Sequence, residues 1–105
     1  MLKLFDFKGE KIYFAYSRYN YGGGLAIMAF TEEGEPWGDI SVNMPNLPSL
    51  GENEIIIPLY NVKDEYEKVF RDNFVEKEIA YVKIGFGDGV CVKLKNHFRE
   101  FMEEL

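Results

Sequence analysis

The chain has 105 residues, of which 47% are hydrophobic and 16% aromatic, and its formal net charge at pH 7 is −6. This composition suits one domain with a hydrophobic core and excludes a disordered chain. A single cysteine excludes an internal disulfide, one thiol with one histidine cannot form a structural zinc site, and the excess of acids argues against direct binding of nucleic acid.

The first half of the sequence consists of short apolar and aromatic runs separated by turn residues, a pattern that predicts β-strands. The predicted strands are residues 2–7, 11–19, 25–31, 39–44 and 54–59. Lys8-Gly9-Glu10 fits a hairpin, and Glu32-Glu33-Gly34-Glu35 fits a turn. Residues 39–44 alternate between polar and apolar, so we expect the apolar side chains from Ile40 to Met44 to share one face.

The second half predicts two helices and a hairpin. Residues 64–74 carry apolar side chains at helical spacing, and Asp64 with Glu67 resembles a capping box. Two alternating segments, residues 78–85 and 90–95, are joined by the turn residues of a hairpin. Residues 97–105 predict a closing helix whose apolar side chains recur at helical spacing and are expected to face the core. These side chains are Phe98, Phe101, Met102 and Leu105.

Together these elements predict a single α+β domain over residues 1–105. We expect an antiparallel sheet of about five to seven strands, an internal helix at about residues 64–74 and a C-terminal helix at about residues 97–105. No apolar run approaches the ~20 residues of a membrane-spanning helix, and the N-terminus lacks the apolar core of a signal peptide. We therefore expect a protein of the reducing cytoplasm of a host bacterium, without a membrane partner.

One long stretch carries the whole net charge. Residues 19–62 contain six acidic residues and no lysine or arginine, whereas the other twelve acids are balanced by the twelve bases of the chain. The six acids of this acidic segment are Glu32, Glu33, Glu35, Asp39, Glu52 and Glu54. Tyr19, Tyr21 and Trp37 lie among them, and aromatic rings beside carboxylates suit contact with Arg- or Lys-rich protein surfaces. The segment predicts a binding surface for a basic partner, although Trp37 fits the core equally well.

Catalytic, metal and cofactor sites find little support in the sequence. His97, the only histidine, has no serine, cysteine or second histidine nearby in sequence, so a half-exposed surface residue is expected. Cys91 should lie opposite Val90 and Val92, away from the core, and lacks a histidine partner. The glycines at 22–24 lack the motif of a phosphate-binding loop and predict a plain loop. No cofactor is expected.

Three segments resemble a known family. Tyr21-Gly-Gly-Gly-Leu-Ala-Ile, Glu33-Gly-Glu-Pro-Trp and Ile40-Ser-Val-Asn-Met-Pro are similar to segments of an uncharacterised family encoded on plasmids, conjugative elements and phages. Its members share a glycine-containing loop, a Leu-Ala-Ile strand, an acidic turn and a strand ending in Val-Asn-Leu-Pro, where this chain has Met44. The resemblance covers residues 20–60 and continues loosely to Leu94. It implies no catalytic residue; it implies a setting in mobile elements, which must survive host defences.

These observations lead to three functional hypotheses. The first is a non-catalytic inhibitor that binds a basic groove on a host nucleic-acid-processing enzyme, such as a nuclease, in the manner of anti-CRISPR or anti-restriction proteins. The second is an accessory or structural interaction domain of a mobile element, with a homodimer as one form. The third, ranked last, is a small enzyme or metal-dependent protein built on Glu32, Glu35 and Asp39.

Overall fold

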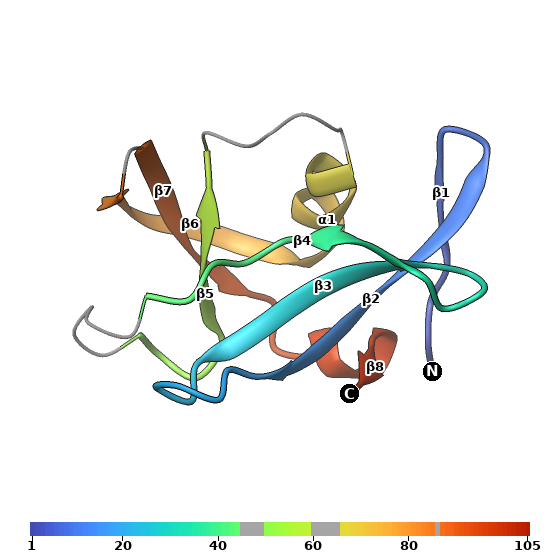
Figure 1. Cartoon of the computed structure of the whole chain (residues 1–105), viewed down its shortest axis with the longest axis horizontal. Coiled ribbons are helices and arrows are strands. Elements are labelled where there is room, and N and C mark those ends of the chain that lie inside the picture. The colour runs from blue at the N-terminus through green and yellow to red at the C-terminus, as the bar shows by residue number, and fades with distance from the viewer. Residues whose placement is uncertain (45–49, 60–65, 86) are drawn as a thin grey trace.

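The computed structural model describes residues 1–44, 50–59, 66–85 and 87–105. These residues form two sheets with one α-helix packed between them (Figure 1). The strands are β1 (Phe5–Phe7), β2 (Glu10–Arg18), β3 (Leu25–Thr31), β4 (Pro36–Asp39), β5 (Glu54–Pro58), β6 (Val75–Ile84), β7 (Gly87–Leu94) and β8 (Glu103–Glu104). The helices are α1 (Tyr66–Phe74) and the 3₁₀-helix η1 (Phe98–Phe101). The α+β class is therefore confirmed.

Sheet A contains five strands, in the order β1-β2-β3-β4, with β8 added to β2. Neighbouring strands along this path are antiparallel, whereas β8 pairs with β2 in parallel. The β1–β2 hairpin forms where the sequence predicts it, because Lys8 and Gly9 adopt φ angles of 49° and 82°. Successive positive φ angles match the right-handed twist of the two strands that a tight hairpin joins.

Sheet B contains three antiparallel strands in the order β5-β7-β6. An isolated antiparallel bridge links it to the segment that follows β4: Val42 N–H donates to Ile56 O at 3.0 Å. The prediction of one sheet is thus wrong, since the eight described strands form two. β6 follows α1 directly and forms one edge of sheet B, with ten residues.

The sheets separate because the predicted strand over residues 39–44 does not continue. β4 ends at Asp39, and the N–H groups of Ile40 and Ser41 both donate to Ile27 O, which interrupts the ladder with β3. Ile40 and Ser41 are both buried, so the expected alternation of faces fails at this point. Met44, the last residue of the predicted strand, lies two residues beyond the bridge residue Val42 and belongs to no strand.

The core between the two sheets and α1 is rich in aromatic rings. Phe14 of β2 is fully buried and contacts Phe5, Phe70 and Phe74, with ring centroids 5.5, 5.3 and 5.8 Å away. Phe70 and Phe74 are four residues apart and therefore lie on one face of α1. The predicted helix end at residue 74 is confirmed, while its predicted capping residue Asp64 lies outside the described residues.

The predicted C-terminal helix over residues 97–105 is wrong. Phe98 and Met102 are buried at 1% and 6% exposure, but Phe101 and Leu105 are 43% and 61% exposed. One 3₁₀ turn is followed by extended backbone from Met102, and Leu105 N–H donates to Tyr16 O at 2.9 Å. The edge of β2 that β1 leaves free supplies hydrogen-bond partners to this segment. The segment therefore pairs as a strand and does not continue as a helix. The two ends of the chain consequently lie close together (Figure 1).

Candidate functional site

Four carboxylates of the acidic segment lie along β4 and the turn before it. Glu32, Glu33 and Glu35 belong to the turn, Asp39 ends the strand, and all four residues are exposed. Thr31 holds the turn: its N–H donates to Glu35 O at 2.9 Å, and its Oγ1 accepts from Glu35 N–H at 3.1 Å. The turn predicted here is confirmed, and it presents these carboxylates on an ordered backbone.

These carboxylates lack a basic partner among the described residues, whereas most acids elsewhere have one. The ion-paired acids are Asp6, Glu67, Asp72, Glu76, Glu78, Asp88 and Glu100. Within the described part of the chain, the acids without an ion pair are Glu10, Glu32, Glu33, Glu35, Asp39, Glu52, Glu54, Glu103 and Glu104. The unneutralised negative charge is thus concentrated in the acidic segment and at the ends of β2 and β8, where it attracts basic surfaces.

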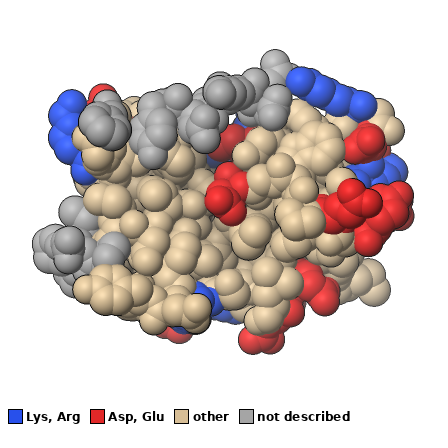
Figure 2. All heavy atoms as spheres, in the orientation of Figure 1, with Lys and Arg blue, Asp and Glu red and all other residues tan. Residues whose placement is uncertain are grey.

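The side of sheet A that faces away from the core carries apolar side chains between these acids. Ile12 and Phe14 are buried in the core, so Tyr13 between them points outward, and Met28 and Phe30 do so in β3. Tyr13 and Phe30 are opposite each other and stack with ring centroids 5.5 Å apart and planes at 15°. Figure 2 shows a broad area without charged side chains, with both acidic and basic groups at its margins.

We call this side the outer face; its residues in β2 and β3 are Lys11, Tyr13, Ala15, Ser17, Ala26, Met28 and Phe30. Sequence reasoning missed these residues as candidates. Alternation in β2 provides a signal for Tyr13, because its neighbours are both apolar core residues. Residues 25–30 are all apolar, so alternation there cannot be read from the sequence.

The aromatic residues predicted for binding fall into different environments. Tyr21 is 72% exposed. Trp37 is only partly buried, but it packs against the core and meets Phe7 edge-on with ring centroids 5.7 Å apart and planes at 90°. Tyr19 is also partly buried, and its hydroxyl lies 2.8 Å from Ser41 Oγ. Tyr21 is thus the predicted aromatic residue most open to a partner.

The environment of Tyr19 shifts its acidity. Burial, more than any other cause, raises the pKa of the Tyr19 phenol. The Ser41 hydrogen bond opposes that change in pKa, and the negative charge of Asp39 adds to it. Tyr19 therefore remains a neutral hydrogen-bonding group well into the alkaline range.

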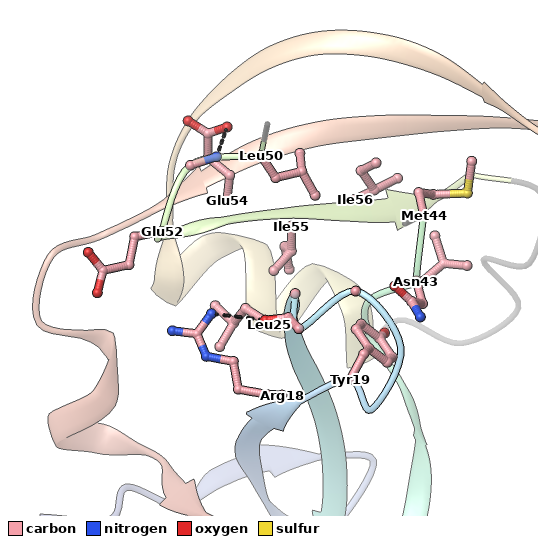
Figure 3. A pocket seen from close by; sticks show the side chains of 15 residues that line it. Arg18, Tyr19, Leu25, Asn43, Met44, Leu50, Glu52, Glu54, Ile55 and Ile56 are labelled. Atoms are coloured by element: carbon pink, nitrogen blue, oxygen red, sulfur yellow. Dashed lines mark hydrogen bonds between the residues drawn. The ribbon is translucent and has the colours of Figure 1, made fainter. Parts of the chain in front are cut away.

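Glu52 and Glu54 lie at the opposite end of β3 from the acidic turn, around a cavity of about 260 Å³. The cavity separates the glycine loop, residues 22–24, from the start of β5, and apolar side chains line much of it (Figure 3). Glu54 Oε1 accepts from Gly51 N–H at 2.9 Å, so this carboxylate supports its own loop. Arg18 lies at the cavity too, and its Nη1 reaches Gly23 O at 3.4 Å. The structure therefore divides the predicted binding residues between two regions.

The remaining polar candidates, His97 and Cys91, differ in their surroundings. His97 lies on the surface as expected but is exposed rather than half-exposed, and its Nδ1 lies 2.9 Å from Glu100 Oε2. Cys91 does lie opposite Val90 and Val92, but it is buried with Ile56 and Ile84 in a second cluster. This burial raises the pKa of the Cys91 thiol, and the charge of Glu54 acts in the same direction.

The described residues contain no group of three or more His, Cys, Asp or Glu side chains that are placed to hold a metal ion. Glu32, Glu35 and Asp39 accordingly do not form the metal site of the third hypothesis. In the part of the chain that the structure describes, no helix has the length and apolar character needed to cross a membrane. No protein-family model matches the chain, and neither a curated protein nor a solved structure is similar to it at a significant level.

Proposed function

We propose that this protein is a non-catalytic inhibitor from a mobile element, and that it binds a basic surface on a host nucleic-acid-processing defence enzyme. The observation that carries the proposal is the row of exposed carboxylates at Glu32, Glu33, Glu35 and Asp39, none of them paired with a described basic residue. Carboxylates on an ordered turn imitate the phosphates that such an enzyme binds through Lys and Arg. The resemblance of residues 20–60 to mobile-element proteins supports the choice of a host enzyme.

Charge makes this proposal directly testable. A tagged wild-type protein and a variant with Glu32, Glu33, Glu35 and Asp39 all changed to Lys are used to capture proteins from bacterial lysate, and the captured proteins are tested for nuclease activity. A DNA-handling enzyme that is retained and inhibited only by the wild type supports the proposal. Binding should weaken as salt is added, because counterions screen both surfaces.

A matched control variant distinguishes the effect of charge at the acidic turn from the effect of the net charge of the protein. Asp72, Glu76, Asp88 and Glu100 are exposed acids on other elements, with ion pairs of the kind that contribute little to stability. Changing these four to Lys alters the formal charge equally, and this control should still bind. If the control and the first variant lose binding together, or if both retain it, the acidic turn is not the binding site.

The alternative function is an accessory interaction domain that forms a homodimer. One observation favours it: β6 is an edge strand of ten residues, and six consecutive residues from Glu76 to Tyr81 are exposed. An open edge can pair with a second copy. Sedimentation analysis over a range of protein concentrations decides between a monomer and a dimer, and the variant Ile79→Lys should dissociate a dimer that forms through β6.

A further inference from the structure

We infer that the outer face of sheet A is a docking surface for an amphipathic helix of a partner protein, with an apolar stripe flanked by Lys and Arg side chains. This inference rests on the proposed function and deepens it, because it states the chemistry of the partner at the same acidic surface. Three features of the sheet carry it: an uncharged centre, carboxylates on both flanks, and a width that matches a helix.

The centre of the outer face is uncharged. An antiparallel sheet that faces water on one side normally places polar and charged side chains there. Here six of the seven outward positions of β2 and β3 hold aromatic, methionine, alanine and serine side chains, and the seventh, Lys11 near the start of β2, is ion-paired with Asp6 of β1. The two alanines are buried, and the partly buried side chains of Tyr13, Met28 and Phe30 form the accessible apolar part of this face. An uncovered apolar area with a polar rim marks a site of protein interaction.

Carboxylates flank this centre in a row that crosses the sheet. Glu103 of β8 pairs with Ala15 of β2, Ala15 pairs with Met28 of β3, and Met28 pairs with Asp39 of β4. Directly opposite residues in neighbouring strands share a face. Across the sheet, the row is therefore Glu103, Ala15, Met28 and Asp39, with a carboxylate at each end. The turn that carries Glu32 borders a third side of the face.

The width of the row fits a helix. Three inter-strand spacings separate β8 from β4, which gives about 14 Å between the flanking backbones. A helix with its side chains is about 10–12 Å wide. Lys and Arg at the margins of its apolar stripe can lay their aliphatic stems on the sheet and extend their charged ends to Asp39 and Glu103.

The negative charge of the carboxylates around the outer face favours a basic helix over other binding partners. A second copy of the chain on the same face would bring two acidic rims together, and like charges repel. Phosphates of nucleic acid and of anionic lipids would be repelled for the same reason. A helix with acidic flanks would be repelled too, so a basic amphipathic helix is the partner whose charge and apolar stripe both match.

The test uses three synthetic helical peptides of about 18 residues, long enough to cross the sheet. The first has a leucine stripe flanked by lysines, the second the same stripe flanked by glutamates, and the third has lysines without a leucine stripe. Each is added to ¹⁵N-labelled protein while amide chemical shifts are recorded. The first peptide should shift amides of β2, β3 and β4; the other two should bind at least about tenfold more weakly.

Variants locate the site. Met28→Gln with Phe30→Gln makes the centre of the outer face polar, and should weaken binding of the first peptide at least about tenfold. Ile79→Gln with Tyr81→Gln is the matched control, because these β6 residues are 44% and 70% exposed and lie on another sheet. The control should bind as the wild type does. If the Met28 and Phe30 variant fails to fold, the shift map of the wild type still decides the question.

The peptide and variant experiments can overturn the docking surface and the inhibitor function separately. No shifts in β2 and β3, equal binding of the stripe-free peptide, or full binding by the Met28 and Phe30 variant would overturn the inference. Binding of the first peptide at this face without inhibition of any host enzyme would leave the docking surface and remove the inhibitor function. Inhibition that depends on Glu32, Glu33, Glu35 and Asp39 but not on Met28 and Phe30 would leave the inhibitor function and remove this docking mode.

Discussion

The hydroxyl of Tyr19 lies 2.8 Å from Ser41 Oγ, and the same Oγ accepts the N–H of Ile27 at 2.9 Å. Ser41 is buried at 5% exposure and lies where the chain leaves β4 and turns toward sheet B. The three groups thus tie the end of β2, the middle of β3 and the segment after β4 to one another. This connection supports both the glycine loop and the sheet that carries the acidic turn.

Replacing Ser41 should destabilise the fold. Ser41→Ala removes the acceptor of the Ile27 N–H and leaves a buried donor unpaired, which costs about 1–3 kcal/mol. Ser17→Ala is the control, because Ser17 is a partly exposed serine of the same sheet. Urea unfolding should show the loss for Ser41→Ala only; equal stability of the two variants would show that water or another group satisfies this N–H.

The stability of the fold should fall in alkaline solution partly because of Tyr19. The folded-state pKa of Tyr19 is raised mainly by burial, so folding favours the neutral phenol. This contribution is fully present below the ordinary tyrosine pKa of about 10 and is lost as pH rises through the higher folded-state value. Tyr19→Phe has no proton to lose at this position. The difference in stability between wild type and Tyr19→Phe should therefore move in favour of the variant above pH 10 or so, and a constant difference would contradict the burial of this phenol.

Phe98 and Phe101 should respond differently to truncation. Phe98 is almost fully buried and meets Tyr16 with ring centroids 5.9 Å apart, so Phe98→Ala should cost about 3–5 kcal/mol. Phe101 is 43% exposed, and Phe101→Ala should cost less than about 1 kcal/mol. Chemical unfolding of the two variants measures the contrast. Equal, large losses would indicate that residues 97–105 form the amphipathic helix that the sequence pattern favours.

Gly38 should tolerate a side chain only if Tyr66 changes as well. A Cβ at position 38 would lie 2.6 Å from the Tyr66 hydroxyl, which itself donates to Asp39 O at 3.1 Å. Gly38→Ala alone should therefore destabilise the protein by about 1–3 kcal/mol, through overpacking. In a Tyr66→Phe background the added loss should be smaller, because the closest atom is gone. A double-mutant cycle measures this coupling, and strict additivity would show that the two residues do not interact.

Much of the strand pattern follows from local sequence. The β1–β2 hairpin, β3, the acidic turn and the β5 segment lie where short apolar runs and turn residues place them, and α1 ends at the predicted Phe74. These features depend on neighbours in sequence, such as Gly9 with its positive φ angle. The exposure of Glu32, Glu33 and Glu35 follows in the same way from a turn around a glycine.

Other features depend on contacts that local sequence does not specify. The apolar side chains of residues 97–105 match a helix, but the free edge of β2 makes strand pairing available there. The burial of Cys91 depends on Ile56 and Ile84, which come from two other strands and cover the far side of sheet B. Likewise, the outer face becomes visible only once register places Tyr13 opposite Phe30. Charge along the chain predicted the acidic rim, but not the apolar centre that it surrounds.

The hydrogen bonds between the two ends of the chain affect the order in which the strands of sheet A can pair during folding. Lys3 N–H donates to Phe101 O at 3.1 Å, and β8 completes the edge of β2, so early residues are bonded to late ones. Contacts between segments this distant in sequence form slowly, because a long loop must close first. On the ribosome, β8 therefore joins the edge of β2 only after residues 103–105 have emerged, and the backbone of β2 at Ala15 and Tyr16 lacks this partner until then.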